Sequence, residues 1–79
     1  MTTEERTRHL LELNGVRHRK VGGTVVAEGN GVKWAIAFDE RGRFEDAWRT
    51  DVRADLIAVK TPLGKVLASL GATKVSEGR

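Results

Sequence analysis

The first apolar residues of the chain have the spacing of an amphipathic helix. They are Leu10, Leu11 and Leu13. Ahead of them, Thr2 and Glu5 have the three-residue separation of a capping box, in which each side chain bonds the other residue's backbone N–H. After them, Asn14-Gly15-Val16 has the sequence of a Schellman C-cap, with glycine at the left-handed position and an apolar residue next to it. The pattern therefore predicts a helix from about Thr3 to Asn14.

Between residues 16 and 50 the pattern changes to short alternating runs separated by glycine-containing turns, which is typical of an antiparallel meander. Asn30-Gly31 favours a two-residue type I′ turn, because both central positions of that turn have positive φ. This turn places Glu28 opposite Lys33 on one face of the sheet. The other face is then apolar and consists of Val25, Ala27, Trp34, Ile36 and Phe38.

The next turn has the sequence of a three-residue loop that ends with Gly42 in the left-handed conformation of a G1 bulge. In this register Phe44 lies opposite Phe38. Trp48 lies opposite Trp34, so we expect all four aromatic residues on the apolar face, covered by helices. A two-residue loop would instead turn the second pair of aromatic residues outward.

The same register defines the opposite, open face of the sheet. We expect its charged positions to be Arg17, Arg19, Glu28, Lys33, Glu45 and Arg49, and its small apolar positions to be Val26, Ala35, Ala37 and Ala47. Such a face is flat and partly apolar, which suits a protein partner or a self-associating sheet at least as well as a nucleic acid. One misfit remains, because Asp46 lies on the buried face opposite Ile36 and needs a partner, a bulge or an edge position there.

The strand ahead of these hairpins is basic. Residues 16–21 contain the only dense basic run of the chain, Arg17-His18-Arg19-Lys20. Few apolar residues accompany this run, so we expect an edge strand, where charged side chains resist pairing with the edge of another sheet.

The last third of the chain predicts a second helix. Thr61 is its expected N-cap, and Pro62 its first residue, a position that proline favours. The apolar stripe has the i, i+3, i+4, i+7 spacing of a helix. It consists of Leu63, Val66, Leu67 and Leu70, and Gly71 follows it. This stripe requires a sheet face to cover.

Together these elements predict one small α+β domain over residues 1–79, with residues 72–79 as a frayed tail. We expect an N-terminal helix, a three-stranded antiparallel β-meander with a possible fourth strand, and a C-terminal helix, with both helices packed on one sheet face. Residues 51–60 fit two alternatives, a short helix capped by Asp51 or a further strand through residues 56–59.

Composition narrows the function classes. The 79 residues are 39% hydrophobic and 32% charged, as in an ordinary globular protein. The absence of cysteine excludes disulfides and thiolate catalysis, and we expect a cytoplasmic protein. No apolar run approaches the roughly 18 residues that a membrane-spanning helix needs, and the acidic start does not resemble a signal peptide.

A candidate binding patch follows from the charge pattern. The net charge is +3, which gives mild attraction to polyanions without requiring a nucleic-acid partner. The candidate patch consists of Arg17, His18, Arg19, Lys20, Lys33 and Arg49. If a register gathers these residues on one face, they form a surface that a nucleic acid could use.

Catalytic candidates are few. His18 is the best, because its cationic neighbours would stabilise a phosphate during acid–base cleavage of RNA. His9 and His18 lie nine residues apart and form no metal motif, so we expect no metal ion. The glycine-rich turns lack the spacing of a phosphate-binding loop and are not followed by a helix, so we expect no cofactor.

The order of helix, antiparallel sheet and helix resembles the double-stranded RNA-binding domain and the HicA-type mRNA-interferase toxins. The segment from Leu10 to Gly15 looks like the opening of the toxins, and Thr61 to Gly71 loosely resembles their closing helix. This likeness implies RNA as a substrate or partner. Where the toxins have a catalytic histidine after a glycine, however, this chain has Gly23-Thr24-Val25. The second helix also begins without the basic residues of the RNA-binding domains, and we assign the chain to no family.

From the sequence we therefore expect a non-enzymatic interaction module. Its partner is expected to be another protein, or a second copy in a homodimer, bound through the sheet face or the sheet edge. The alternative is a nucleic-acid-binding protein that uses the basic patch on the first strand and sheet face. An RNase-like activity of His18 is the third hypothesis.

Overall fold

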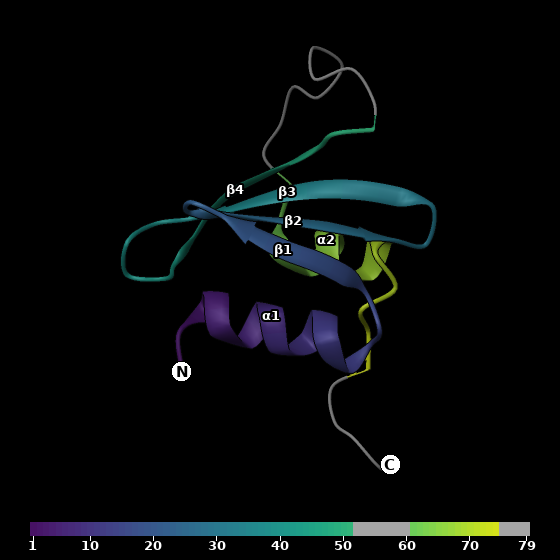
Figure 1. Ribbon diagram of the computed structural model, residues 1–79, viewed down its shortest axis with the longest axis horizontal. Coiled ribbons are helices and arrows are strands. Elements are labelled where there is room, and N and C mark those ends of the chain that lie inside the picture. Colours follow the sequence, from purple (N-terminus) through teal and green to yellow (C-terminus); the bar gives the residue numbers. More distant parts are fainter. Residues whose placement is uncertain (52–60, 75–79) are drawn as a thin grey trace.

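The computed structural model describes residues 1–51 and 61–74, which form two helices and one four-stranded sheet (Figure 1). The elements in chain order are α1 (Thr3–Leu13), β1 (Arg17–Val21), β2 (Thr24–Gly29), β3 (Val32–Phe38), β4 (Phe44–Arg49) and α2 (Leu63–Ser69). The antiparallel strand order is β1-β2-β3-β4, and both helices lie on the same side of the sheet. The predicted α+β class is confirmed. The two alternatives for residues 51–60 concern a segment that is outside the described residues, apart from Asp51.

Both ends of α1 form as predicted. Glu5 N donates to the Thr2 hydroxyl at 3.1 Å, and Thr2 N donates to the Glu5 carboxylate at 2.8 Å, which completes the capping box. Hydrogen bonding to the carboxylate, first from the Thr2 backbone N–H and then from the Thr2 side chain, lowers the pKa of the Glu5 carboxyl. At the other end Gly15 has φ of +70°, and Val16 N donates to Leu11 O at 2.8 Å, as in a Schellman motif.

The N-terminus of α2 differs from the prediction by one residue. Pro62 is the N-cap instead of Thr61, because Pro62 is extended, with ψ of 143°, and its carbonyl accepts the first helical hydrogen bonds. Its C-terminus repeats the Schellman motif of α1, since Gly71 has φ of +79° and Ala72 N donates to Leu67 O at 2.8 Å.

Of the predicted frayed tail, residues 75–79 lie outside the described residues, whereas residues 72–74 are held in place. Ala72 is buried, and Asn14 exchanges two hydrogen bonds with the backbone of Lys74, both 2.9 Å long. The end of α1 is thereby joined to the chain beyond α2.

The β2–β3 hairpin has the predicted turn and register. Asn30 and Gly31 have φ of 54° and 78°, as a type I′ turn requires. Glu28 pairs with Lys33, and the five apolar residues of the predicted core face are all buried. The turn also contacts α2, because the Asn30 amide donates to Ser69 O at 3.2 Å.

The β3–β4 hairpin is only partly as predicted. Gly42 has φ of 77°, and Phe44 lies opposite Phe38, with their rings edge to face at 6.4 Å. A β-bulge between Ala37 and Phe38 then shifts the register by one residue. Trp48 therefore lies opposite Ala35 on the open face, so the prediction that all four aromatic residues share the core is wrong.

The bulge removes the misfit that the sequence register contained. Glu45 is the additional residue on β4, and Asp46 moves from the buried face to a position opposite Ala37, where it is exposed. Ala47, expected on the open face, is instead buried opposite Ile36. The bulge thus exchanges a carboxylate in the core for a methyl group.

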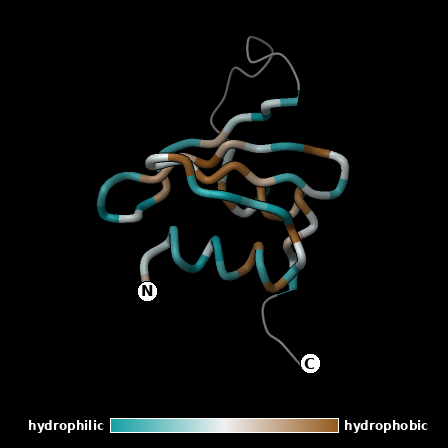
Figure 2. Tube along the Cα trace, viewed as in Figure 1, coloured by the Kyte–Doolittle hydropathy of each residue, from teal (hydrophilic) through white to brown (hydrophobic). Residues whose placement is uncertain are grey.

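The core lies between the sheet and the two helices. Figure 2 shows β1 as hydrophilic along most of its length, whereas apolar residues recur along β2 and β3. The buried hydrophobic cluster consists of Leu11, Val16, Val25, Ala27, Trp34, Ile36, Phe38, Ala47, Val66, Leu70 and Ala72. Each helix therefore contributes its apolar side to one shared core.

The β3–β4 turn caps the first helix. Glu4 N, which has no partner within its own helix, donates to Gly42 O at 2.9 Å. The turn lies so close to the helix that a Cβ built on Gly42 would be 2.7 Å from the Thr2 Cβ. Glycine is therefore required at this position for two reasons, its positive φ and this close approach.

We expect Gly42→Ala to lower the free energy of unfolding by more than the roughly 1–2 kcal/mol that left-handed alanine costs, because the added methyl group also displaces Thr2. Gly15→Ala is the matched control, since Gly15 has a similar φ of +70° and a Cβ added to it would meet no atom within 4 Å. Urea denaturation of the two variants measures the difference. Equal losses would show that the contact with Thr2 contributes nothing.

Candidate functional site

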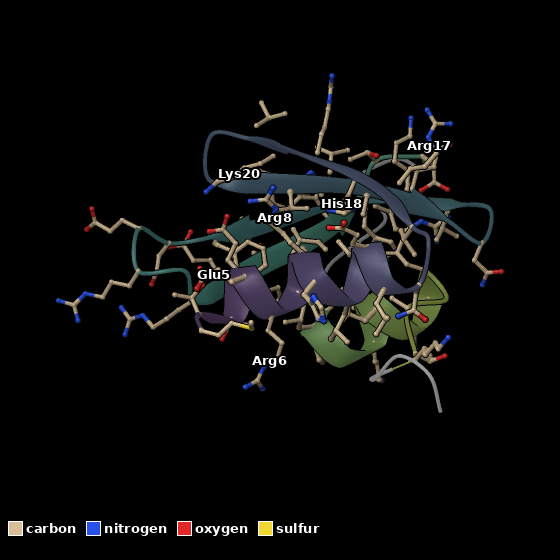
Figure 3. The ribbon with its side chains drawn as sticks, turned by 60° about the horizontal axis from the view of Figure 1, so that its bottom comes forward. Glu5, Arg6, Arg8, Arg17, His18 and Lys20 are labelled. Carbon is tan, nitrogen blue, oxygen red and sulfur yellow. The ribbon has the colours of Figure 1, made fainter. Side chains whose placement is uncertain are left out.

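The six basic residues of the predicted patch are divided between the two sides of the sheet. Strand register places Arg17, Arg19 and Lys33 on the open face. His18, Lys20 and Arg49 occupy positions on the helix-covered face, where His18 pairs with Ala27 and Lys20 pairs with Val25. The six residues therefore do not form the predicted single patch, although Arg17, Arg19 and Lys33 lie together on the open face. Figure 3 shows Arg17, His18 and Lys20 along β1 beside α1.

The two cations on the helix side are each paired with a carboxylate. Lys20 Nζ lies 2.7 Å from a carboxylate oxygen of Glu4, a residue of α1 that is largely buried. Arg49 donates two hydrogen bonds of 2.6 Å to Asp51 and also lies over the Trp34 ring, 5.9 Å from its centroid. These cations hold elements of the fold together and are not available to a ligand in the same way as the cations of the open face.

The open face is a grid of three rows that cross the four strands. Reading each row from β1 towards β4, the first contains Arg17, Glu28 and Lys33, the second Arg19, Val26, Ala35 and Trp48, and the third Val21, Thr24, Ala37 and Asp46. We call this set of residues the open face. Charged groups are concentrated in the first row, and the second runs from a cation at one edge to an indole at the other.

Two large apolar side chains of the open face are exposed. Trp48 has 37% of its surface exposed and Val21 54%. Ala35, which lies on β3 between Val26 and Trp48 in the second row, is only 4% exposed. By contrast Trp34, on the other face, is 6% exposed and donates a hydrogen bond to the Ser69 hydroxyl at 3.2 Å.

A depression lies at the opposite side of the open face from Trp48. It is lined by Arg17, His18, Arg19, Val26, Glu28 and Lys33. Val26 gives it an apolar component, and both signs of charge are present around it. The open face therefore has a projecting aromatic side chain on β4 and a shallow hollow over β1, β2 and β3.

The electrostatics of the open face are mixed. Its cations are Arg17, Arg19 and Lys33, and its carboxylates are Glu28 and Asp46, so the face carries a net charge of about +1. Glu28 lies between Arg17 and Lys33 in the same row, where it reduces the positive potential of both. This pattern favours a partner that itself carries both signs of charge.

His18 makes a backbone contact through one of its two ring nitrogens. Its Nδ1 lies 3.0 Å from Val16 O, so that nitrogen donates to the carbonyl and the ring is held against the start of β1. Within the described part of the chain the ring makes no hydrogen bond to a carboxylate that would orient it as a general base. No group of three or more His, Asp and Glu residues that could hold a metal ion occurs among the described residues.

Two carboxyls near the ends of β3 and β4 are held in the charged state. Arg43 and Arg41 donate hydrogen bonds that lower the pKa of Asp39. Arg49 lowers the pKa of Asp51 to about 2, and Asp51 in turn raises the pKa of Arg49. The Asp39 contacts lie within the β3–β4 turn, the Arg49–Asp51 pair lies at the end of β4, and both are outside the open face.

The exposed indole is the feature that reasoning from the sequence missed. The sequence did contain a signal for it, because the expected register buried the Asp46 carboxylate opposite Ile36. A bulge was one of the three ways to avoid an unpaired carboxylate there. Placing the bulge after Phe44 would have turned Trp48 outward and Ala47 inward, as the structure does.

We expect the Arg49–Asp51 pair to make stability dependent on pH in acid. Because the folded pKa of Asp51 is lowered from 3.8 to about 2, its contribution is present above pH 4 and disappears as the pH falls towards 2. Asp51→Asn should therefore be less stable than wild type at pH 6 and equal to it near pH 2, in urea titrations at each pH. In an Arg49→Gln background the pH dependence of Asp51→Asn should be smaller, because the Arg49 hydrogen bonds are the largest cause of the lowered pKa while those of the Asp51 and Lys33 backbone remain. A difference between wild type and Asp51→Asn that stays constant with pH would contradict the pairing.

Comparisons with known proteins leave the function to be argued from this geometry. No protein-family model, curated protein or solved structure matches the chain. No helix among the described residues has the length and apolar character needed to cross a membrane.

Proposed function

We propose that this chain is a non-enzymatic cytoplasmic interaction module that binds a protein through the open face. The observation that carries this proposal is the exposed Trp48 on a sheet face that neither helix covers. Tryptophan and arginine are the residues that most often dominate the binding energy of protein interfaces, and Arg17 and Arg19 lie on the same face.

The composition of the open face supports a protein partner over a polyanion. A protein interface has an apolar centre with polar groups around it, and here Val26 and Ala35 are flanked by charged residues. A nucleic acid would place its phosphates near Glu28 as well as near the cations, and this repulsion offsets part of the attraction. Protein surfaces, which carry both signs of charge, can match Glu28 and Lys33 together.

The size of the open face sets the strength of the interaction. Four strands at a spacing of about 4.8 Å and three rows of side chains cover roughly 20 Å by 20 Å. An interface of this size buries about 800 Å² in total, which is below the usual range for stable complexes. We therefore expect a weak, reversible association.

Photo-crosslinking tests the proposed function. A benzophenone amino acid replaces Trp48, and the matched control carries it at Arg6, which is exposed on α1 and points away from the sheet in Figure 3. In cells that naturally produce the protein, we expect protein adducts from position 48 and few from position 6. Equal adducts at both positions, or none at position 48, would overturn the proposal.

A second candidate function is the binding of single-stranded nucleic acid. It is favoured by one observation, that Trp48 shares its face with three cations, since aromatic residues beside basic ones can stack bases and hold phosphates. The carboxylates Glu28 and Asp46 on the same face count against nucleic-acid binding, because they repel phosphates.

If nucleic acid binds the open face, three cations set its salt dependence. The logarithm of the association constant should fall with the logarithm of salt at a slope of about −2 for a single strand. Trp48→Ala should weaken binding by about 1–3 kcal/mol for each stacked base. Fluorescence anisotropy of a labelled oligonucleotide pool measures both quantities. An association constant that does not change with salt concentration, or that is the same for wild type and Trp48→Ala, would exclude this function.

A further inference from the structure

We propose that the partner bound by the open face is a second copy of this chain, and that each Trp48 fills the depression of the other copy. This inference rests on the proposed function, because it names the occupant of the same face. Its basis is that a two-fold axis parallel to the strands makes the first row of the open face complementary in charge and brings Trp48 of one copy to the depression of the other.

The position of the axis determines which residues meet. Two sheets that pack face to face keep their strands within about 30° of each other in the aligned arrangement. A two-fold axis along the strands, between β2 and β3, keeps each row in place and reverses the order of the strands. β1 then faces β4 of the second copy, and β2 faces β3.

In this arrangement the charges of the first row complement each other. Glu28 faces Lys33 of the second copy, and Lys33 faces Glu28, so the two copies contribute four charges of alternating sign. In the second row the partly exposed Val26 faces the buried Ala35 of the second copy, so Val26 supplies most of the apolar middle of the contact. Complementary charges around an apolar centre fix how two protein surfaces align with each other.

The shapes of the two faces also correspond. Trp48 of the second copy lies over Arg19, at the border of the depression that Arg17, Arg19 and Val26 help to line. The indole can enter this hollow, where the guanidinium groups lie against its ring face in cation–π contacts. Because the axis is two-fold, each dimer contains two such contacts.

Other dimers are less favourable. An axis across the strands would place Arg19 on Arg19 and bring each Lys33 opposite an alanine, so like charges meet and the Glu28–Lys33 complement is lost. Pairing through the free edge of β1 would align the basic run of one copy with that of the other. The arrangement with the axis along the strands is the one that separates like charges.

Charge reversal at the centre tests the dimer. In Glu28→Lys, all four central charges of a homodimer are positive, and in Lys33→Glu all four are negative. We expect wild type to dimerise with rising concentration in sedimentation velocity, and each variant alone to stay monomeric. An equimolar mixture of the two variants should restore the dimer, because lysines then face glutamates across the interface.

Several controls keep this result interpretable. Each charge variant also places like charges side by side within one copy, so circular dichroism and thermal melting establish that it is folded; the mixture cannot repair a fold defect. Lys65→Glu replaces a lysine by a glutamate, as Lys33→Glu does, but at an exposed position of α2, and it should leave the dimer intact. Trp48→Ala should remain folded and lose at least tenfold in dimer affinity.

The outcomes separate this inference from the proposed function. A wild-type chain that is monomeric up to about 1 mM, or a variant mixture that does not associate, overturns the dimer. If position 48 crosslinks to a different protein while the chain stays monomeric, the proposed function stands and the dimer is wrong. Adducts of twice the mass of the chain at position 48, with none at position 6, support both. No adduct at position 48 and no dimer overturn both.

Discussion

The one-residue β-bulge in the β3–β4 hairpin is the constraint on which the rest of the molecule depends. Without it, Asp46 would face Ile36 in the core, and Trp48 would lie beneath the helices. With it, Ala47 completes the core and the indole lies on the surface. A small change in backbone pairing therefore decides both that the core is free of an unpaired carboxylate and that the opposite face has an aromatic side chain.

The two faces of the sheet differ in whether their charged side chains form ion pairs. On the helix side, Lys20 bonds Glu4 and Arg49 bonds Asp51, so each cation has its carboxylate within the fold. On the open face, Glu28 lies between Arg17 and Lys33 in the register, and the described contacts include no ion pair of 4.0 Å or less among them. Within the sheet, Arg17, Glu28 and Lys33 therefore present their charges on the open face, which also has the most exposed aromatic residue, Trp48.

Much of this architecture could be predicted from local sequence. The capping box, both glycine-terminated helix ends and the Asn30-Gly31 turn depend on residues within one turn of each other, so their chemistry is complete in the sequence. The position of Trp48 could not be obtained in this way. It depends on which of two β3–β4 registers forms, one that buries Asp46 or one that buries Ala47. The free-energy difference between these registers involves the whole sheet and cannot be obtained from neighbouring residues alone. The candidate patch failed partly for the same reason, because Arg49 changed faces together with Trp48. His18 and Lys20 lie on the helix side for a simpler reason, since successive side chains alternate between the two faces along β1.

The first helix is tied at both ends to segments far along the chain. Its N-terminus is capped by the Gly42 carbonyl, and Asn14 at its C-terminus bonds Lys74, 60 residues away. All strand pairs of the meander join neighbours in sequence, so the sheet can assemble from local hairpins. The helix has its complete set of partners only after the β3–β4 turn and the segment beyond α2 are in place. The earliest element in the chain is therefore completed by residues that are synthesised much later, and a nascent chain cannot form all the contacts of α1 until Lys74 has left the ribosome.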